Sequence, residues 1–253
     1  MNASLTRWRQ AGLVWPGVLA LAGVAVLIGL GSWQMSRKAW KEGLIAQIGA
    51  RVHAAPMPLS EALRQWRDKG DVEYLHVRVS GRFRHARERH VFAVDERLGP
   101  GFYIYTPLET DKRQLVLVNR GFVPTPLKEP TTRPAGQIEG EVTLTGLARR
   151  PMSRSPFTPA SEPQRNMFYW PDYPGMLASA REAGSVELTP LPFFIDADAE
   201  PANPGGFPRG GVTRLNLPNR HLEYALTWYG LALTLIGVFA AFARARLRSE
   251  GPL

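Results

Sequence analysis

Two long uncharged runs, one near each end, dominate the hydrophobic pattern of this chain. The first has 27 residues without a charge between Arg9 and Arg37, and the second has 20 between Glu223 and Arg244. A helix of about 20 apolar residues crosses the roughly 30 Å hydrocarbon core of a bilayer, so both runs are long enough to span it. The pattern therefore predicts a membrane protein with a large extramembrane region between two transmembrane helices.

The two predicted spans divide the chain into five segments. Trp15 and Trp33 lie near the two ends of the first run, where indole rings favour the level of the lipid headgroups. The run is longer than the roughly 7–15 residue apolar core of a signal peptide, so we expect a retained anchor. The predicted segments are a tail (1–11), a first span (12–35), an extramembrane domain (36–220), a second span (221–243) and a second tail (244–253).

The short basic tails predict the orientation of the chain. Arg7 and Arg9 precede the first span, and arginines at 244, 246 and 248 follow the second. Positive charge in short segments marks the cytoplasmic side, whereas a loop as long as the middle region crosses largely regardless of its charge. We expect cytoplasmic termini and an exported, periplasmic middle domain. The location expected is a bacterial inner membrane, because about ten residues before the first span leave no room for a mitochondrial transit peptide.

Period-two alternation in the middle region predicts a mainly antiparallel β domain, either a barrel or a sandwich, with short helices. The expected turns include one at Gly81 and one at residues 99–101, and Ser60 is expected to cap a helix. Two Pro-rich stretches, 124–134 and 151–163, are expected to be loops. Strands are predicted within 72–83, 90–110, 113–124, 139–150 and 191–198, and helices at 36–52 (continuing the first span), 60–68 and 173–182.

Composition and charge remove several classes of function. The chain has no cysteine, which excludes a disulfide scaffold, a thiolate metal site and a cysteine nucleophile. Its net charge of +9 comes from arginines that are scattered rather than clustered with aromatic residues, so membrane lipid rather than nucleic acid is the expected partner. None of the familiar phosphate-binding or hydrolase motifs occurs. We therefore expect a protein that is not an enzyme.

His221 is the most informative single residue. It stands at the start of the second span, and Tyr224 and Trp228 follow it near one helical face. An imidazole in this position is compatible with an axial ligand to a metal or haem. The alternative is an interfacial polar side chain that bonds to lipid headgroups.

Other polar residues carry weaker signals. The sequence Asn119-Arg120-Gly121 follows an apolar strand and predicts either an arginine that pairs with an anion or a turn. Asp196 and Asp198 have strand spacing, which is compatible with paired acids or metal ligands, but we favour a strand that runs into a loop. Two further histidines, His85 and His90, are expected in a charged, solvated hairpin tip.

Five short blocks in order give the chain a family resemblance. It resembles the Surf1 (Surfeit locus 1, Shy1-like) family of cytochrome c oxidase biogenesis factors. The blocks are LGSWQMSRKAWKEGLI (30–45), GPGFYIYTPLE with VLVNRGFVP (99–124), NMFYWPD (166–172), PFFIDAD (192–198) and PNRHLEYALTWYGLA (218–232).

The resemblance implies a factor that aids delivery of haem a to oxidase subunit I, or the maturation of that subunit. It implies that His221 is the ligand of the haem iron and that haem a is held transiently. The macrocycle would lie against Trp228 and Tyr224, and the propionates would pair with Arg220 or Arg214. Other oxidase subunits and haem-synthesis proteins are further implied partners. The alternative is a structural chaperone or accessory subunit that docks on the oxidase without binding haem.

Overall fold

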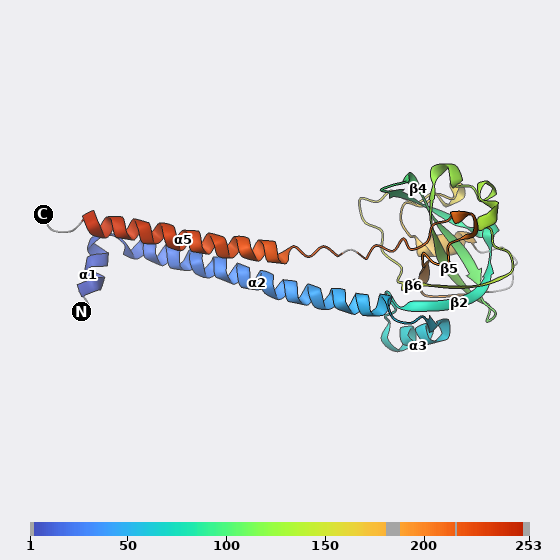
Figure 1. Cartoon of the computed structure of the whole chain (residues 1–253), viewed down its shortest axis with the longest axis horizontal. Helices are drawn as coiled ribbons and strands as arrows, with labels where there is room; N and C mark the ends of the chain where they lie inside the picture. Colours follow the sequence, from blue (N-terminus) through green and yellow to red (C-terminus); the bar gives the residue numbers. More distant parts are fainter. Residues whose placement is uncertain (1–2, 181–187, 216, 250–253) are drawn as a thin grey trace. The chain divides into compact units, whose positions relative to one another are not determined.

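The computed structural model describes residues 3–180, 188–215 and 217–249, and the chain forms two compact units. The helical unit consists of Met1–Gln47 and Asn216–Leu253, and the sheet domain consists of Ile48–Leu215. Three helices build the helical unit (Figure 1): α1 (Ala3–Gln10), α2 (Val14–Val52, whose last turn belongs to the sheet domain) and α5 (His221–Ser249).

Helices α2 and α5 are both long and apolar enough to cross a membrane. Only 6% and 11% of their most apolar stretches are buried, so neither is a core helix of this chain. The 39 residues of α2 span about 58 Å, nearly twice the thickness of a hydrocarbon core. The predicted continuation of the first span as a helix is therefore confirmed, while the span boundaries at 12–35 and 221–243 stay predictions.

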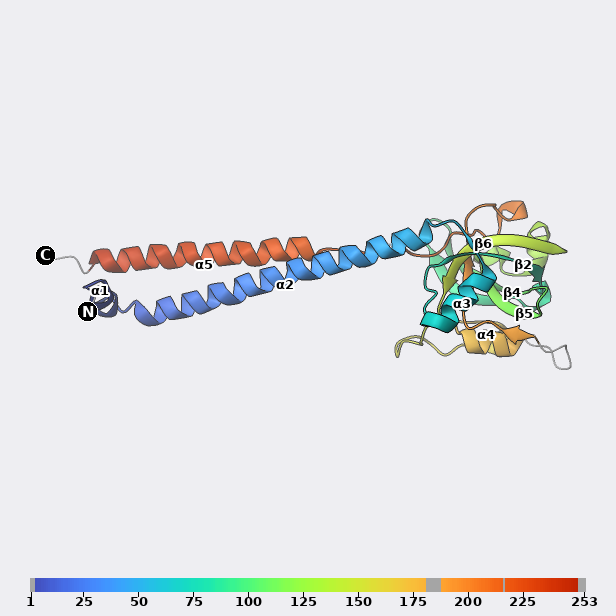
Figure 2. The same cartoon turned by 90° about the horizontal axis from the view of Figure 1, so that it is seen from below.

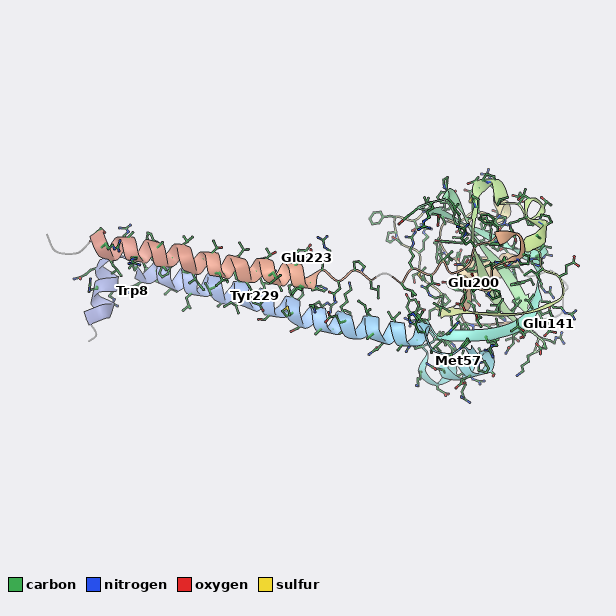
Figure 3. All side chains as sticks on the ribbon, viewed as in Figure 1. Trp8, Met57, Glu141, Glu200, Glu223 and Tyr229 are labelled. Carbon is green, nitrogen blue, oxygen red and sulfur yellow. The ribbon has the colours of Figure 1, made fainter. Side chains whose placement is uncertain are left out.

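Close packing joins α2 to α5, which run side by side in both views (Figures 1 and 2). Gly23 of α2 lies against Leu235, and Gly31 lies against the ring of Tyr229, where any β carbon would overlap it. Small residues at such contacts let two helix backbones approach, which is a common way for membrane helices to associate. At the other end of the pair, the ring of Trp8 on α1 lies 6.2 Å from that of Phe239 (Figure 3).

The sheet domain is a small barrel, which confirms the predicted mainly antiparallel β fold. Its ring of strands runs β2-β6-β8-β5-β4 and closes because β2 also pairs with the end of β4. Strands β1, β7 and β3 extend β2, β5 and β4 respectively, and the pairs β1–β2, β5–β7 and β5–β8 are parallel. The strands are β1 (Met57–Pro58), β2 (His76–Phe83), β3 (Arg89–Asp95), β4 (Gly99–Glu109), β5 (Gln114–Pro124), β6 (Glu141–Arg149), β7 (Thr189–Pro190) and β8 (Phe194–Ala197).

Two hydrophobic cores lie on opposite faces of β5. Val116 and Val118 pack in a core that α3 (Leu59–Lys69) covers, whereas Leu115 and Leu117 pack in a second core under α4 (Tyr173–Ala180). Figure 2 shows both helices against the barrel. Burial of both faces explains why β5 has a nearly continuous apolar sequence rather than an alternating one.

Several predicted boundaries were wrong, and each has a local cause. Gly81 is not in a turn but inside β2, at the seam where the carbonyl oxygen of Glu109 on β4 leaves no room for a β carbon. The segment from 72 to 75 is not a strand because Tyr74 has a positive φ of 61°. The turn expected at 99–101 lies just before, at 96–98, where an oxygen of Asp95 accepts two backbone N–H groups.

The short helices follow the prediction closely. Helix α3 begins after Pro58 with no side-chain cap, so Ser60 lies within it, and Gly70 ends it in a left-handed conformation (φ 64°). Helix α4 begins at the predicted residue, while residues 181 and 182 of the expected helix lie outside the described residues. The Pro-rich stretch at 124–134 contains short 3₁₀ turns and connects β5 to β6, and 151–163 is irregular, as predicted for loops.

Candidate functional site

A hydrogen bond between the two long helices fixes the candidate site. The Nδ1 atom of His221, at the first position of α5, lies 2.8 Å from Oε1 of Gln34 on α2. With the amide oxygen as acceptor, Nδ1 carries the ring proton. The Nε2 atom then has no proton and keeps its lone pair. A neutral imidazole binds a metal through such an unprotonated nitrogen.

The packing of α5 places His221 on the face that meets α2. Ala225 and Ala232 are buried on the same stripe, one and three turns further along the helix. The hydroxyl of Tyr229 lies 3.3 Å from that of Ser32, and the Tyr229 ring packs against Gly31, where a β carbon would overlap it (Figure 3). Helical periodicity therefore turns His221 toward α2 rather than outward.

Contacts before the helix extend the pairing. The Nζ atom of Lys41 donates to the carbonyl oxygen of Pro218 at 2.6 Å, so the segment that enters α5 is also attached to α2. Gln34 and Lys41 are two turns apart on α2, and together they hold both the backbone before His221 and its ring. The imidazole is thus held at a defined place on the helix pair.

The other predicted site residues lie less directly against this histidine. Tyr224 is 54% exposed and points away from the buried stripe, whereas Trp228 is half-buried two turns from His221. Arg220 makes two hydrogen bonds to the carboxylate of Glu223, at 3.0 and 2.9 Å, on the exposed side. Arg214, the second arginine expected to pair with a propionate, belongs to the sheet domain.

The prediction of a solvated loop at His85 and His90 was wrong. His90 is 2% exposed in β3, and its Nε2 lies 2.7 Å from Glu88, which also forms a buried ion pair with Arg133. His85 is half-buried, and burial lowers its pKa. The missing information is the partner, because Arg133 comes from the Pro-rich stretch 45 positions away and no local pattern connects the two.

The Asn119-Arg120-Gly121 segment continues β5 and is not a turn at its end. Arg120 is 1% exposed, and its pKa is lowered by burial to about 10. Gly121 has a positive φ of 117°, as the predicted turn required. The residue lies within β5, however, at a place where the carbonyl group of Arg209 leaves no room for a β carbon.

Asp196 and Asp198 are both engaged in structural hydrogen bonds. Asp196 accepts from Asn119, Arg149 and Thr213, at 2.8–2.9 Å. Asp198 follows the end of β8, as expected for a strand that runs into a loop, and lies 2.8 Å from Nε2 of His76. Among the residues that the structure describes, no group of three or more His, Asp or Glu side chains could hold a metal ion.

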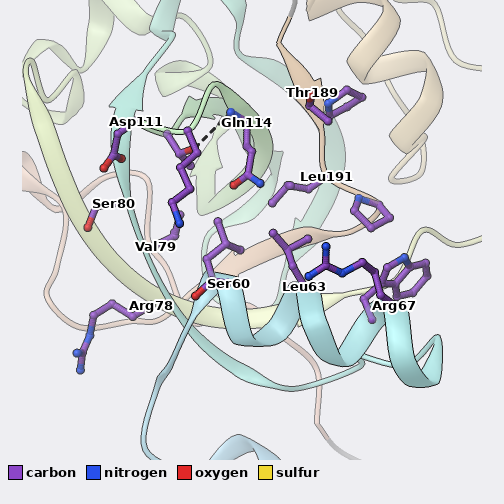
Figure 4. Close-up of a pocket in the computed structure, with 16 residues that line it drawn as sticks. Ser60, Leu63, Arg67, Arg78, Val79, Ser80, Asp111, Gln114, Thr189 and Leu191 are labelled. Carbon is purple, nitrogen blue, oxygen red and sulfur yellow. Dashed lines mark hydrogen bonds between the residues drawn. The ribbon is translucent and has the colours of Figure 1, made fainter.

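A groove of about 580 Å³ opens between α3 and the edge of the barrel at β7 (Figure 4). Leu63 and Leu191 contribute apolar walls, and Arg67, Lys112 and Asp111 contribute charged groups. Its size is that of a small-molecule or peptide groove. The groove is the second candidate site of the molecule and belongs entirely to the sheet domain.

Sequence reasoning gave no role to Gln34. The sequence did offer one signal, since Gln34 is an amide inside a long uncharged run. A polar side chain in or near a membrane span usually contacts another polar group, so a polar partner for Gln34 could have been expected. The partner could not be identified, since 187 positions separate Gln34 from His221.

Two long apolar helices stand before and after a small barrel in the chain, and a histidine is bonded across the helix pair; together they define a protein with two candidate membrane helices. The model of the SURF1 family matches residues 21–233, and the chain belongs to this family. It is 40% identical over 220 residues to Surfeit locus protein 1 of Homo sapiens, covering 81% of this chain and 69% of the relative.

Two further relatives show the same extent of similarity. Surfeit locus protein 1 of Rattus norvegicus is 39% identical over 236 residues, covering 87% of this chain and 73% of the relative. A SURF1-like protein of Monosiga brevicollis is 38% identical over 250 residues, covering 93% of this chain and 89% of the relative. The family match thus includes the whole sheet domain, most of α2 and the first 13 residues of α5.

Proposed function

We propose that this chain is a biogenesis factor for cytochrome c oxidase that holds haem a transiently and passes it to oxidase subunit I. The factor performs no catalysis of its own. Membership of the SURF1 family supports a role in oxidase assembly, which the family resemblance implies. The observation that carries the haem part is the His221 imidazole, whose Nδ1 is bound to Gln34 at the junction of two apolar helices.

The residues around His221 fit a haem cargo. Nδ1 donates to Gln34, so Nε2 is the atom that would bind the iron. Histidines that bind a metal through one ring nitrogen usually donate the other ring N–H to a neighbouring oxygen in this way. Trp228 and the apolar surface of α5 supply ring and aliphatic contacts for the macrocycle, with Tyr224 exposed beside them.

Arg220 is a cation of the helical unit that a haem propionate could pair with. Its present partner, Glu223, is an exposed neighbour on the same chain, and such ion pairs contribute little free energy. A propionate can therefore take the place of Glu223 at small cost. The location that goes with this proposal is a bacterial inner membrane, and the tail charges support cytoplasmic termini with the sheet domain on the periplasmic side.

The absorption spectrum of the purified protein tests the proposal. The full chain is expressed in a host that makes haem a and is purified in detergent. A haem a spectrum is expected, and the His221→Ala variant is expected to lose it, because the iron loses its protein ligand. His53→Ala is the matched control, since His53 follows the end of α2, is exposed, and its ring bonds only to the carbonyl oxygen of Gly49. Equal haem content in His221→Ala and the wild type would overturn the ligand assignment.

Gln34→Leu should loosen the haem without removing it. Without the Gln34 oxygen, the Nδ1–H group has no acceptor and the imidazole ring is no longer held in one orientation. Changes of this kind lower metal affinity by about 10–100-fold. Gln34→Glu keeps an acceptor and should retain binding with a shifted reduction potential. The measurement is a haem titration with spectroelectrochemistry, with Ser36→Ala as control because its hydroxyl bonds only to the Ser32 carbonyl. Unchanged affinity and potential in both Gln34 variants would contradict the role.

The alternative, a structural chaperone or accessory subunit that does not bind haem, predicts a different preparation. The protein would be colourless and would still co-purify with oxidase subunit I when haem synthesis is blocked. The groove beside α3 is the surface that this alternative would use for docking (Figure 4). A colourless protein that retains subunit I would replace the haem proposal with this one.

A further inference from the structure

Arg120 is a buried cation of the sheet domain that forms no ion pair with any described residue. The side chain is 1% exposed, and its Nη2 donates to Asn203 at 2.9 Å and to the carbonyl oxygen of Gly136. The guanidinium also lies 4.8 Å from the centre of the Phe83 ring. In the described ranges no carboxylate lies within ion-pair distance of it, and its Nε has no hydrogen-bond partner.

The nearest buried acid is already committed. Glu88 is 3% exposed, and its carboxylate is shared between the guanidinium of Arg133 and the imidazole of His90. Neutral oxygens of Gly136 and Asn203 orient Arg120 but do not cancel its charge. A buried charge of this kind usually has a counter-ion, because an isolated one is strongly unfavourable in a low-dielectric interior.

A cavity of about 310 Å³ opens beside Arg120, between β6 and the loop after β8. Arg120 and Asn203 line it together with Phe83, Leu144 and Thr143. Asp198 and Glu200 line the same cavity, yet neither is within ion-pair distance of Arg120. The cavity therefore carries a cation on one part of its wall and two carboxylates on another, with space between them.

We propose that this cavity binds a small amino carboxylate, with its carboxylate against Arg120 and its ammonium group facing Asp198 and Glu200. The carboxylate supplies the missing counter-charge and an acceptor for the guanidinium. On the other wall, Asp198 already accepts from His76 and Thr145, at 2.8 and 2.5 Å, whereas Glu200 bonds only to the backbone N–H of Ala202. Glu200 is thus the principal partner of the ammonium group, and the apolar side chains contact the carbon chain between.

Three probes of equal chain length separate the two ends of the ligand. Isothermal titration of the full chain in detergent is run with 4-aminobutyrate, with butyrate and with n-butylamine. We expect 4-aminobutyrate to bind at roughly millimolar concentration, as its small size allows. Butyrate should bind at least about tenfold more weakly, and n-butylamine should show no saturable binding. Equal binding of 4-aminobutyrate and butyrate, or no saturable binding of any probe, overturns the proposal.

Two variants test where the ligand binds. A second variant is needed because Arg120→Gln also removes hydrogen bonds to the loops that contain Gly136 and Asn203, and could affect folding. Arg120→Gln should abolish binding. Thr143→Trp, at an exposed position on the cavity wall, should block the cavity and keep the fold. Arg84→Gln is the matched control, since Arg84 pairs with Glu109 and does not line the cavity. Wild-type affinity in Thr143→Trp overturns the proposal even if Arg120→Gln does not fold.

Discussion

Replacing Gly121 by alanine should prevent stable folding of the sheet domain. A β carbon at this position would overlap the carbonyl oxygen of Arg209, and the backbone has a φ of 117° that L residues rarely adopt. The overlap cannot relax locally, because Phe122 and Arg209 exchange two backbone hydrogen bonds, of 2.9 and 2.8 Å, next to it. We expect a loss of more than about 4 kcal/mol in the free energy of unfolding, among the largest effects of a single substitution.

Gly140→Ala separates the conformational cost from the overlap. Gly140 also has a positive φ, 83°, but no atom lies within 4 Å of the β carbon that alanine would add. Its substitution should cost only about 1–2 kcal/mol. The measurement is thermal unfolding of both variants with limited proteolysis of the full chain in detergent. Similar stability for the two would show that the contact with Arg209 relaxes freely, contrary to this argument.

Glu88→Gln should destabilise the sheet domain by about 3–5 kcal/mol, because it removes one member of a buried ion pair. Glu88 is paired with Arg133 and is within 2.7 Å of His90, and all three side chains are buried. Without its charge, Arg133 and the neighbouring Arg120 would both be buried with no carboxylate partner among the described residues. Denaturant unfolding of the full chain measures the effect.

The double variant Glu88→Gln, Arg133→Met should recover much of this loss, because it also removes the Arg133 charge that Glu88→Gln alone leaves buried and unpaired. Glu109→Gln is the control, because the Glu109 pair with Arg84 is about one-third exposed and should be worth at most about 1 kcal/mol. If Glu88→Gln costs no more than Glu109→Gln, the buried cluster does not depend on its charge.

Periodicity along the chain predicted the elements that depend on local sequence. The two long helices follow from uncharged runs, and β5 follows from an apolar stretch that is too short for a span. Gly70 ends α3 as its position predicts, because a left-handed residue closes the last turn. In these cases the residues that determine the structure are neighbours in the sequence.

Features that depend on distant partners were not predictable. Gly81 has the sequence signature of a turn, yet glycine is needed there because the backbone of Glu109 on β4, 28 positions away, leaves no room for a β carbon. His90 was predicted to be solvated because the stretch that ends at it (82–90) is rich in charge, and its burial depends on Arg133. The same holds for the candidate site, since His221 was identifiable from its place before an apolar run while its partner Gln34 was not.

The order of strands in the barrel sets a limit on how early the domain can fold during synthesis. Strand β8 lies between β5 and β6, so the ring cannot be completed before residue 197 has left the ribosome. Until then the edge of β5 that will pair with β8 has no partner, and unpaired strand edges are sites of wrong association. The pairing of β5 with β8 also joins residues 77 positions apart, and contacts of such long range make folding slow. A chain that stops before Phe194 should therefore leave an open sheet that depends on chaperones or is degraded.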